Sequence, residues 1–362
     1  MSIYVFLVSY IVIFPIILKS VFRNHHTYRK AVALWGMFAV FLLLSLKAPS
    51  VGMDIWGYKR EYELARFQSW LSWDYVYFES GYIFLNKLFS KLGVSFQLFT
   101  AFLYGFTCFA WYKIIKKHST NPAMSVLIFV CYQFFVFSNS ALRQTLSIAI
   151  CIFAFLELEK STWRSSLIST LLFLGAYAVH TGALAFVAVI VAWLLSKNRK
   201  KISLIEIFLT LIAGIALRTS IQSIIKNQFG RSGFDLSFIT SGNFWFIVLI
   251  FAFICYTYYF YCLRGINTQT FYEEFYIYSF TVRISLYCVL GQILFSGSTV
   301  LRSVIYLTLF IAVLLPSFIC LYSRKDRTVI NILLSAFLIY LFVTQTLLPN
   351  QLQIVPYKFF WE

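Results

Sequence analysis

Apolar runs alternate with short polar segments along the whole chain, and this pattern sets the predicted architecture. Each run is long enough to cross a bilayer as a helix, so we expect an all-α polytopic membrane protein. The predicted transmembrane helices are about twelve and cover residues 2–18, 31–46, 93–115, 122–138, 144–157, 166–179, 182–196, 202–217, 243–263, 275–296, 303–321 and 328–348. Residues 1–362 are predicted to form a single transmembrane domain with two larger outer loops, at 47–92 and 218–242.

Composition supports a membrane protein and limits the partners. Hydrophobic residues make up 60% of the sequence and charged residues 12%, about half the charged share of a soluble protein. The net charge of +17 would suit a nucleic-acid-binding protein, but Lys and Arg gather in short segments between apolar runs. This placement is typical of signals that orient a membrane protein, so we expect membrane lipid and no nucleic acid as a partner.

The distribution of basic residues predicts the orientation of the chain. Seventeen of the 30 Lys and Arg residues fall in short connections on one side of the predicted topology, including 19–30 and 197–201. Short basic loops stay in the cytoplasm. Both termini and both long loops are therefore predicted to face the periplasm or the cell exterior.

His180 lies in the middle of an uncharged stretch, residues 165–196, between the basic segments "EKSTWR" and "SKNRKK". A single helix would place one basic segment outside, so we predict two short helices with His180 at their outer tip. Gly182 permits the tight turn. Arms of about 14 residues span only about 21 Å, which predicts an outward-facing cavity with His180 at its floor. There the imidazole could act as a general base or bind a phosphate or a sugar hydroxyl.

Three arginines are candidates for binding a diphosphate, because a guanidinium binds phosphate oxygens in a bidentate manner. Arg143 in "SNSALRQ" and Arg302 in "SGSTVLRS" lie at outer turns, where snorkelling to lipid headgroups is the alternative interpretation. Arg283 lies deeper in its helix. It either joins the polar site or pairs structurally with a carboxylate.

Two acids of the first outer loop, Asp54 and Glu79, are further candidates for a general base or for binding sugar hydroxyls. Most loop acids are merely solvated. The surrounding aromatic residues, as in "FQSWLSWDYVYFESGY", could stack on sugars or form a membrane-interface belt.

Several common signatures are absent from the sequence. It contains no P-loop, no GxGxxG and no His/Asp/Glu spacing typical of a metal site. We therefore expect no cofactor and no metal, and a substrate that arrives already activated from the membrane.

Five segments in order along the chain resemble the EpsG-like branch of the Wzy-type O-antigen and exopolysaccharide polymerases. They are the first outer loop "VGMDIWGYKREYELA", the arginine–glutamine segment "FFVFSNSALRQTLSIAICIFAF", the histidine segment "AYAVHTGALAF", the late arginine–tyrosine helix "VLRSVIYLTLFIAVLLPSF" and the C-terminal "NQLQIVPYKFFW". The matches cover nearly the whole chain.

The resemblance implies a GT-C-like enzyme of the bacterial inner membrane whose active site faces the periplasm. Such enzymes transfer a growing glycan from undecaprenyl diphosphate to the nonreducing-end sugar of a new lipid-linked repeat unit, without a metal. They usually work with a chain-length regulator protein. Together with the residue-level reasoning, this assigns catalytic roles to His180, Glu79 and Asp54, diphosphate binding to Arg143, Arg302 and Arg283, and glycan binding to Tyr58, Gln144, Tyr306 and Tyr357.

Three other classes fit parts of the pattern. An O-antigen ligase also handles a lipid diphosphate but uses lipid A-core as the acceptor. A lipid-linked repeat-unit flippase would be a transporter, for which internal repeats and charges along a central path are expected. A membrane O-acyltransferase would also use a histidine, but its acyl donor arrives from the cytoplasmic side, opposite to the side predicted for His180.

Overall fold

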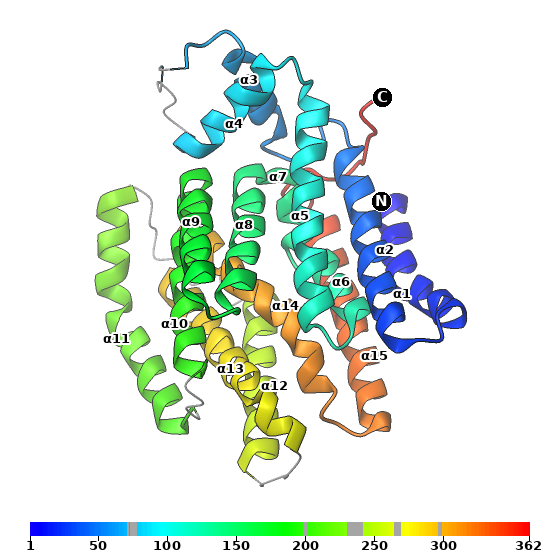
Figure 1. The fold of residues 1–362 in the computed structure, drawn as a ribbon, viewed down its shortest axis with the longest axis vertical. Helices are drawn as coiled ribbons and strands as arrows, with labels where there is room; N and C mark the ends of the chain where they lie inside the picture. Colours follow the sequence, from blue (N-terminus) through cyan, green and yellow to red (C-terminus); the bar gives the residue numbers. More distant parts are fainter. Residues whose placement is uncertain (71, 73–77, 198–201, 230–241, 264–268, 296–298) are drawn as a thin grey trace. The chain divides into compact units, whose positions relative to one another are not determined.

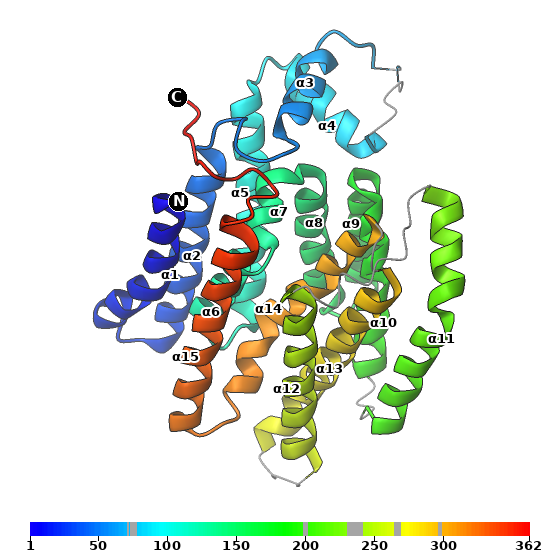
Figure 2. The ribbon, with the colours of Figure 1, turned by 180° about the vertical axis from the view of Figure 1, so that it is seen from behind.

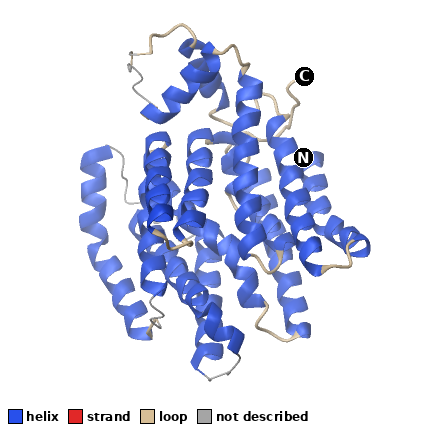
Figure 3. Ribbon diagram, in the orientation of Figure 1, coloured by secondary structure: helices blue, strands red, loops and turns tan. Residues whose placement is uncertain are grey.

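The computed structural model is almost entirely helical in the part of the chain that it describes (Figures 1 and 3). The described residues are 1–70, 72, 78–197, 202–229, 242–263, 269–295 and 299–362. They form two compact units. Unit 1 consists of Met1–Ala183 and Thr328–Glu362, and unit 2 of Leu184–Arg327. The single domain over 1–362 stays a prediction.

The helices of unit 1 come from both ends of the chain (Figure 2). They are α1 (Ser2–Val21), α2 (His25–Ser45), α3 (Ile55–Ala65), α4 (Ser80–Lys91), α5 (Phe96–His118), α6 (Pro122–Cys131), α7 (Phe134–Ser140), α8 (Leu142–Leu158), α9 (Trp163–Val179) and α15 (Arg324–Leu341), which is followed by the π-helical turn η4 (Phe342–Leu347). Unit 2 contains α10 (Phe186–Lys197), α11 (Leu204–Phe229), α12 (Gly242–Leu263), α13 (Gln269–Phe295), the 3₁₀ turn η3 (Thr299–Val304) and α14 (Ile305–Ile319). The 3₁₀ turn η1 (Thr181–Ala185) crosses the boundary between the units, and so does α15, whose first four residues belong to unit 2.

Each predicted transmembrane segment coincides with helical structure, which confirms the all-α polytopic class. Within the described ranges, eight helices are long and apolar enough to cross a membrane, or nine if the bent pair α6 and α7 is one span. Helices α8, α9 and α10 are shorter, with 17, 17 and 12 residues. The number of twelve crossings therefore stays a prediction.

The segment predicted as one helix at 122–138 is broken, and that prediction was wrong. Helix α6 ends at Cys131 and α7 begins at Phe134, with a bend of 49° between them. Gln133 has a φ of 56°, which lies outside the right-handed helical region and interrupts the helix. The run of apolar letters gave no signal for this break.

The helix predicted at 202–217 ends later than expected, because α11 continues to Phe229, and the second outer loop at 218–242 stays a prediction. Apolar residues recur at helical spacing beyond the predicted end, at Ile221, Ile225 and Phe229, which explains why the helix continues. The remainder, 230–241, lies outside the described residues.

The first predicted outer loop, 47–92, contains two helices, α3 and α4, beyond the ends of α8 and α9 (Figure 1). Its start is tied to the C-terminal segment, because the Ala48 amide donates to the Lys358 carbonyl at 2.8 Å. Lys47 is 4% exposed, and its ammonium donates to the carbonyls of Val51 and Asn139. These bonds fix the loop against the end of α7.

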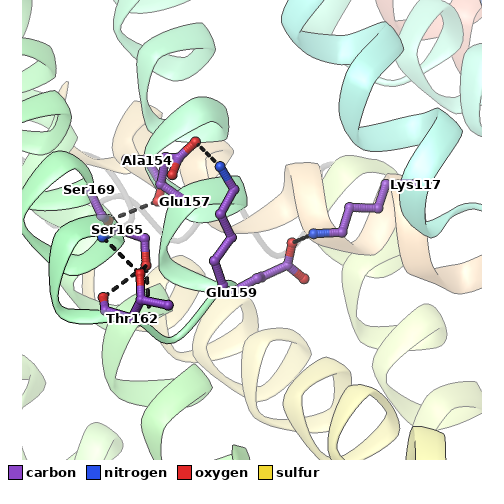
Figure 4. Close-up of polar contacts among 8 residues, drawn as sticks. Lys117, Ala154, Glu157, Glu159, Thr162, Ser165 and Ser169 are labelled. Carbon is purple, nitrogen blue, oxygen red and sulfur yellow. Dashed lines mark hydrogen bonds and ion pairs between the residues drawn. The ribbon is translucent and has the colours of Figure 1, made fainter.

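Local capping explains where several helices of unit 1 begin. The Asn24 side chain accepts hydrogen bonds from the first turn of α2, and Ser95 does the same for α5. Thr162 and Ser165 form a reciprocal capping box at the start of α9 (Figure 4). Each cap satisfies backbone amides that have no partner inside the helix.

The opposite end of unit 1 has a polar cluster of its own, around Glu159 at the end of α8. Lys117 Nζ lies 2.6 Å from the Glu159 carboxylate (Figure 4). The ring nitrogen Nε2 of His118 lies 3.0 Å from the same carboxylate. Nearby, the Ser169 hydroxyl on α9 donates to the Ala154 carbonyl on α8 at 2.8 Å.

Candidate active site

Arg143 and His180 lie at the same end of an antiparallel helix pair, α8 and α9. The Ser147 hydroxyl, one turn after Arg143, donates to the Ala176 carbonyl, one turn before His180, at 2.8 Å. A second bond of the same kind joins the two helices toward their other ends (Figure 4). The pair therefore brings together two side chains that are 37 positions apart in the sequence.

The start of α4 lies against the end of α9, and a glycine makes this approach possible. A Cβ atom on residue 81 would lie 2.8 Å from both the carbonyl carbon and the carbonyl oxygen of Ala178. Gly81 has no Cβ, so the two backbones can meet there. Glu79, at the N-cap of α4, is thereby placed beside His180, which directly follows α9.

The Glu79 carboxylate joins the candidate residues into one cluster. Its Oε2 accepts a hydrogen bond from Arg143 Nη1. Its Oε1 lies 2.9 Å from His180 Nδ1 and accepts from the Thr181 amide at 3.1 Å. The side chains of Glu79, Arg143 and His180 are 19%, 20% and 24% exposed, so a substrate can reach each of them.

The charge state of Glu79 follows from these contacts. Burial raises the pKa of its carboxyl, but the hydrogen bond from His180, the charge of Arg143 and the Thr181 amide outweigh burial and hold the pKa at about 2. The carboxylate is therefore ionised at neutral pH. A carboxylate with so low a pKa is a weak proton acceptor, which makes Glu79 better suited to orienting its neighbours than to acting as the base.

The ionised carboxylate also fixes the tautomer inferred for His180. A carboxylate only accepts hydrogen bonds, so Nδ1 of the imidazole must carry the proton that Glu79 receives. In the neutral ring, Nε2 then keeps its lone pair. His180 can therefore act as a general base through Nε2 while Glu79 holds the ring.

Aromatic rings enclose the guanidinium of Arg143. Its Cζ lies 4.5 Å from the ring centroid of Phe78 and 5.9 Å from that of Tyr58, and Nε donates to the Tyr58 hydroxyl at 3.4 Å. The two rings stack on each other, with centroids 5.3 Å apart. Such contacts favour a cation and restrict its orientation.

Two other predicted residues lie next to this cluster in the sequence and in the fold. Asp54 is exposed at the N-cap of α3, one turn before Tyr58. Gln144 follows Arg143 in the first turn of α8, with its side chain buried. Neither forms part of the Glu79 contacts described above, and their predicted catalytic and glycan-binding roles stay predictions.

Tyr357 makes structural contacts within unit 1. Its hydroxyl donates to the Leu43 carbonyl on α2 at 2.9 Å, and its ring packs edge-on against Tyr4 on α1, with centroids 6.0 Å apart. These contacts tie the C-terminal segment to the first two helices. Its predicted role in glycan binding stays a prediction.

The remaining predicted site residues lie in unit 2. Arg302 is exposed in η3, and Tyr306 is fully buried in the first turn of α14. Their predicted roles in binding diphosphate and glycan stay predictions.

Arg283 has the contacts of a structural ion pair. It is 2% exposed on α13, and its Nη2 lies 3.3 Å from Oε1 of Glu206 on α11. Its Nη1 donates to the hydroxyls of Ser196 and Ser279. Ser196 is in the last turn of α10. This environment favours the pairing role that the sequence left open over diphosphate binding.

Sequence reasoning did not single out two residues that shape the site. Phe78 precedes Glu79 in an aromatic-rich segment, where nothing distinguishes the ring that lies over Arg143. Lys47 follows an apolar run and resembles an ordinary helix-end lysine, yet it is buried and bonded to α7. A lysine beside a glycine-containing loop is too common a pattern to have predicted this.

One protein-family model matches the chain. No curated protein and no solved structure matches it. In the described part of the chain, no three His, Cys, Asp or Glu side chains gather as metal ligands. The model of the EpsG family matches residues 30–359, nearly the whole chain. That range includes all ten of the predicted site residues. This multi-pass membrane protein belongs to the EpsG family, a Wzy-like family of polysaccharide polymerases.

Proposed function

We propose that this protein is an O-antigen or related surface-polysaccharide polymerase of the bacterial inner membrane. It takes a glycan chain from undecaprenyl diphosphate and transfers it to a new lipid-linked repeat unit at the periplasmic face. The observation that supports this proposal best is the Glu79 carboxylate, which holds His180 and Arg143 side by side in a member of the EpsG family. The pair offers a proton acceptor next to a fixed cation, as this transfer requires.

The reaction forms one bond and breaks one bond. A hydroxyl oxygen of the acceptor sugar bonds to the anomeric carbon of the donor glycan, and the bond from that carbon to the diphosphate oxygen breaks. The hydroxyl proton passes to Nε2 of His180, while Nδ1 remains bonded to Glu79. Undecaprenyl diphosphate leaves with the electron pair of the broken bond.

Arg143 acts on the leaving group in this scheme. Negative charge develops on the diphosphate oxygen as the bond breaks, and a guanidinium fixed in advance stabilises that charge. Tyr58 and Phe78 hold the guanidinium in place. Two further predictions are that Arg302 binds the same diphosphate and that Asp54 or Glu79 serves as the base. Alanine variants of these residues, assayed for polymer on the gel described below, test them.

The first experiment deletes the gene and restores it while surface polysaccharides are resolved on a gel. For an O-antigen polymerase, the lipopolysaccharide ladder collapses to a single-repeat band and returns on complementation. Loss of all O-antigen bands would indicate a ligase or a flippase instead. An unchanged ladder directs the same test to capsule and exopolysaccharide, and normal polymer in every fraction would contradict the proposal.

Matched variants then test the site. Arg143→Ala and His180→Ala are expected to abolish polymer while the protein still reaches the membrane. His118→Ala is the control, because His118 also bonds a glutamate, Glu159, at the other end of unit 1. A fully active Arg143→Ala protein would exclude the diphosphate role, and equal losses in His180→Ala and His118→Ala would show a general folding effect.

A further inference from the structure

A second concave site lies in the first outer loop, farther along α3 than the residue that contacts the catalytic cluster. It is a pocket of about 600 Å³, within the range of about 300–1,000 Å³ typical of small-ligand pockets. Successive turns of α3 line it with Lys59, Tyr62, Glu63 and Arg66, and the start of α5 closes the other side. We refer to it as the α3 pocket.

The α3 pocket has a rigid aromatic floor and an open aromatic rim. Tyr62 is 3% exposed, its hydroxyl donates to the Val94 carbonyl at 2.8 Å, and its ring stacks on Phe99. Phe67 and Phe360, in contrast, are 85% and 47% exposed. The rim therefore offers flat apolar faces to a ligand in a pocket that the floor has already shaped.

The polar lining carries charges of both signs. Lys59 and Glu63 lie one turn apart, with 3.8 Å between the ammonium nitrogen and the carboxylate oxygen, and Arg66 is exposed beside them. Lys59 and Arg66 offer donors, and Glu63 offers acceptors that a phosphate, itself an acceptor, would leave unused. A sugar presents an apolar ring face and hydroxyls that both donate and accept hydrogen bonds, so aromatic faces with donors and acceptors suit it well.

Helix α3 connects this pocket to the catalytic cluster. Tyr58 contacts Arg143, and Tyr62, one turn or about 6 Å later along the helix, lines the α3 pocket. When the reducing-end sugar of a glycan is bound at Arg143, the remaining sugars of the chain must lie elsewhere on the protein. The α3 pocket is next to that position.

We propose that the α3 pocket binds a short internal segment of the glycan chain, a few sugars away from the reacting bond. This inference rests on the proposed function, because it assumes that the substrate is a glycan. Binding there would retain the chain between transfers, so that weakening the pocket shortens the product without stopping the reaction. The pocket thereby acts on chain length and not on the chemical step.

The test measures binding of glycan fragments to the purified full-length protein in detergent. The probes are fragments of a few repeat units from partial hydrolysis of the strain's own surface polysaccharides, detected by saturation-transfer NMR. Arg66→Ala is compared with Arg60→Ala, because Arg60 is exposed on α3 but does not line the pocket. Phe67→Ala is a second variant, and its exposed side chain makes misfolding an unimportant risk.

The expected result is that Arg66→Ala and Phe67→Ala weaken fragment binding roughly tenfold or more, as loss of a charged hydrogen bond or a stacking face implies. Wild type and Arg60→Ala should bind equally, and Arg66→Ala and Phe67→Ala should also make shorter polymer in cells. Equal binding by Arg66→Ala and Arg60→Ala overturns the inference, as does no binding by wild type. The gene deletion tests the polymerase proposal separately, so failure of the pocket inference can be distinguished from failure of the proposed function.

Discussion

Replacing Glu79 with glutamine removes the charge that joins His180 to Arg143 while keeping the size of the side chain. The amide can still accept one hydrogen bond through its oxygen. It cannot neutralise the Arg143 guanidinium. Its NH₂ group, a hydrogen-bond donor, would face the N–H donors of Arg143 or His180. The expected result is a protein that reaches the membrane but transfers glycan slowly, because the amide can no longer present one acceptor oxygen to Arg143 and another to His180, so the tautomer of His180 is no longer fixed.

The size of the effect follows from the pKa of Glu79. Its value of about 2 lies about 2.5 below the ordinary value of 4.5, and this difference corresponds to about 3 kcal/mol in favour of the charged form. If the whole amount is lost from the transition state, the rate falls by roughly 300-fold. Any part lost from the folded state appears instead as a lower free energy of unfolding.

The two contributions are separated by measuring rate and stability on the same preparations. Transfer is followed in membranes with radiolabelled lipid-linked repeat units, and thermal unfolding is followed in detergent. Glu159→Gln is the control, because Glu159 also bonds a histidine and a cation, at the other end of unit 1. It is expected to lower stability with little effect on the rate per folded molecule.

The reasoning is refuted if Glu79→Gln keeps a rate within about threefold of wild type at equal stability. The wild-type protein should also show an acid-dependent loss of stability that the variant lacks. Because the pKa of Glu79 is lowered by folding, its contribution is complete above about pH 4.5 and disappears as the pH falls toward about 2. Identical acid profiles of the two proteins would contradict the ion-pair assignment.

Three further substitutions test the site and its support. Arg143→Lys keeps the charge but not the planar fork, so it should restore less than a tenth of the polymer on the complementation gel. Gly81→Ala should separate α4 from α9 and lower the transfer rate roughly tenfold or more, whereas Gly57→Ala, with open space around it, should not. Glu206→Gln should lower the melting temperature in detergent more than Arg283→Met, because only the first leaves a buried guanidinium without its carboxylate.

Hydropathy was sufficient to locate the long apolar helices, because a long apolar run has few alternatives to a helix in a membrane. It could not locate features that depend on single backbone angles. The break at Gln133 occurs within an apolar run, and the extension of α11 to Phe229 crosses polar residues that resembled a loop. In both cases the polarity of the segment predicted the wrong backbone conformation: an apolar run contains a break, and a polar segment continues a helix.

Candidate site residues could be chosen from the sequence by chemistry, but their partners could not. Arg143, His180 and Arg283 each stand out as ionisable groups near apolar runs. The structure gives the first two a shared carboxylate and the third a separate one, from Glu206. Nothing in the sequence distinguishes these outcomes, because the pairing depends on which helices pack together.

The position of Glu79 shows why the contact itself was out of reach. It is 64 residues from Arg143 and 101 residues from His180, so no spacing rule relates the three. The contact needs α8 and α9 to run antiparallel, α4 to begin above them, and residue 81 to lack a side chain. Only the fold combines these conditions. In the sequence, Glu79 looks like one solvated loop acid among several, but in the structure its carboxylate orients both His180 and Arg143.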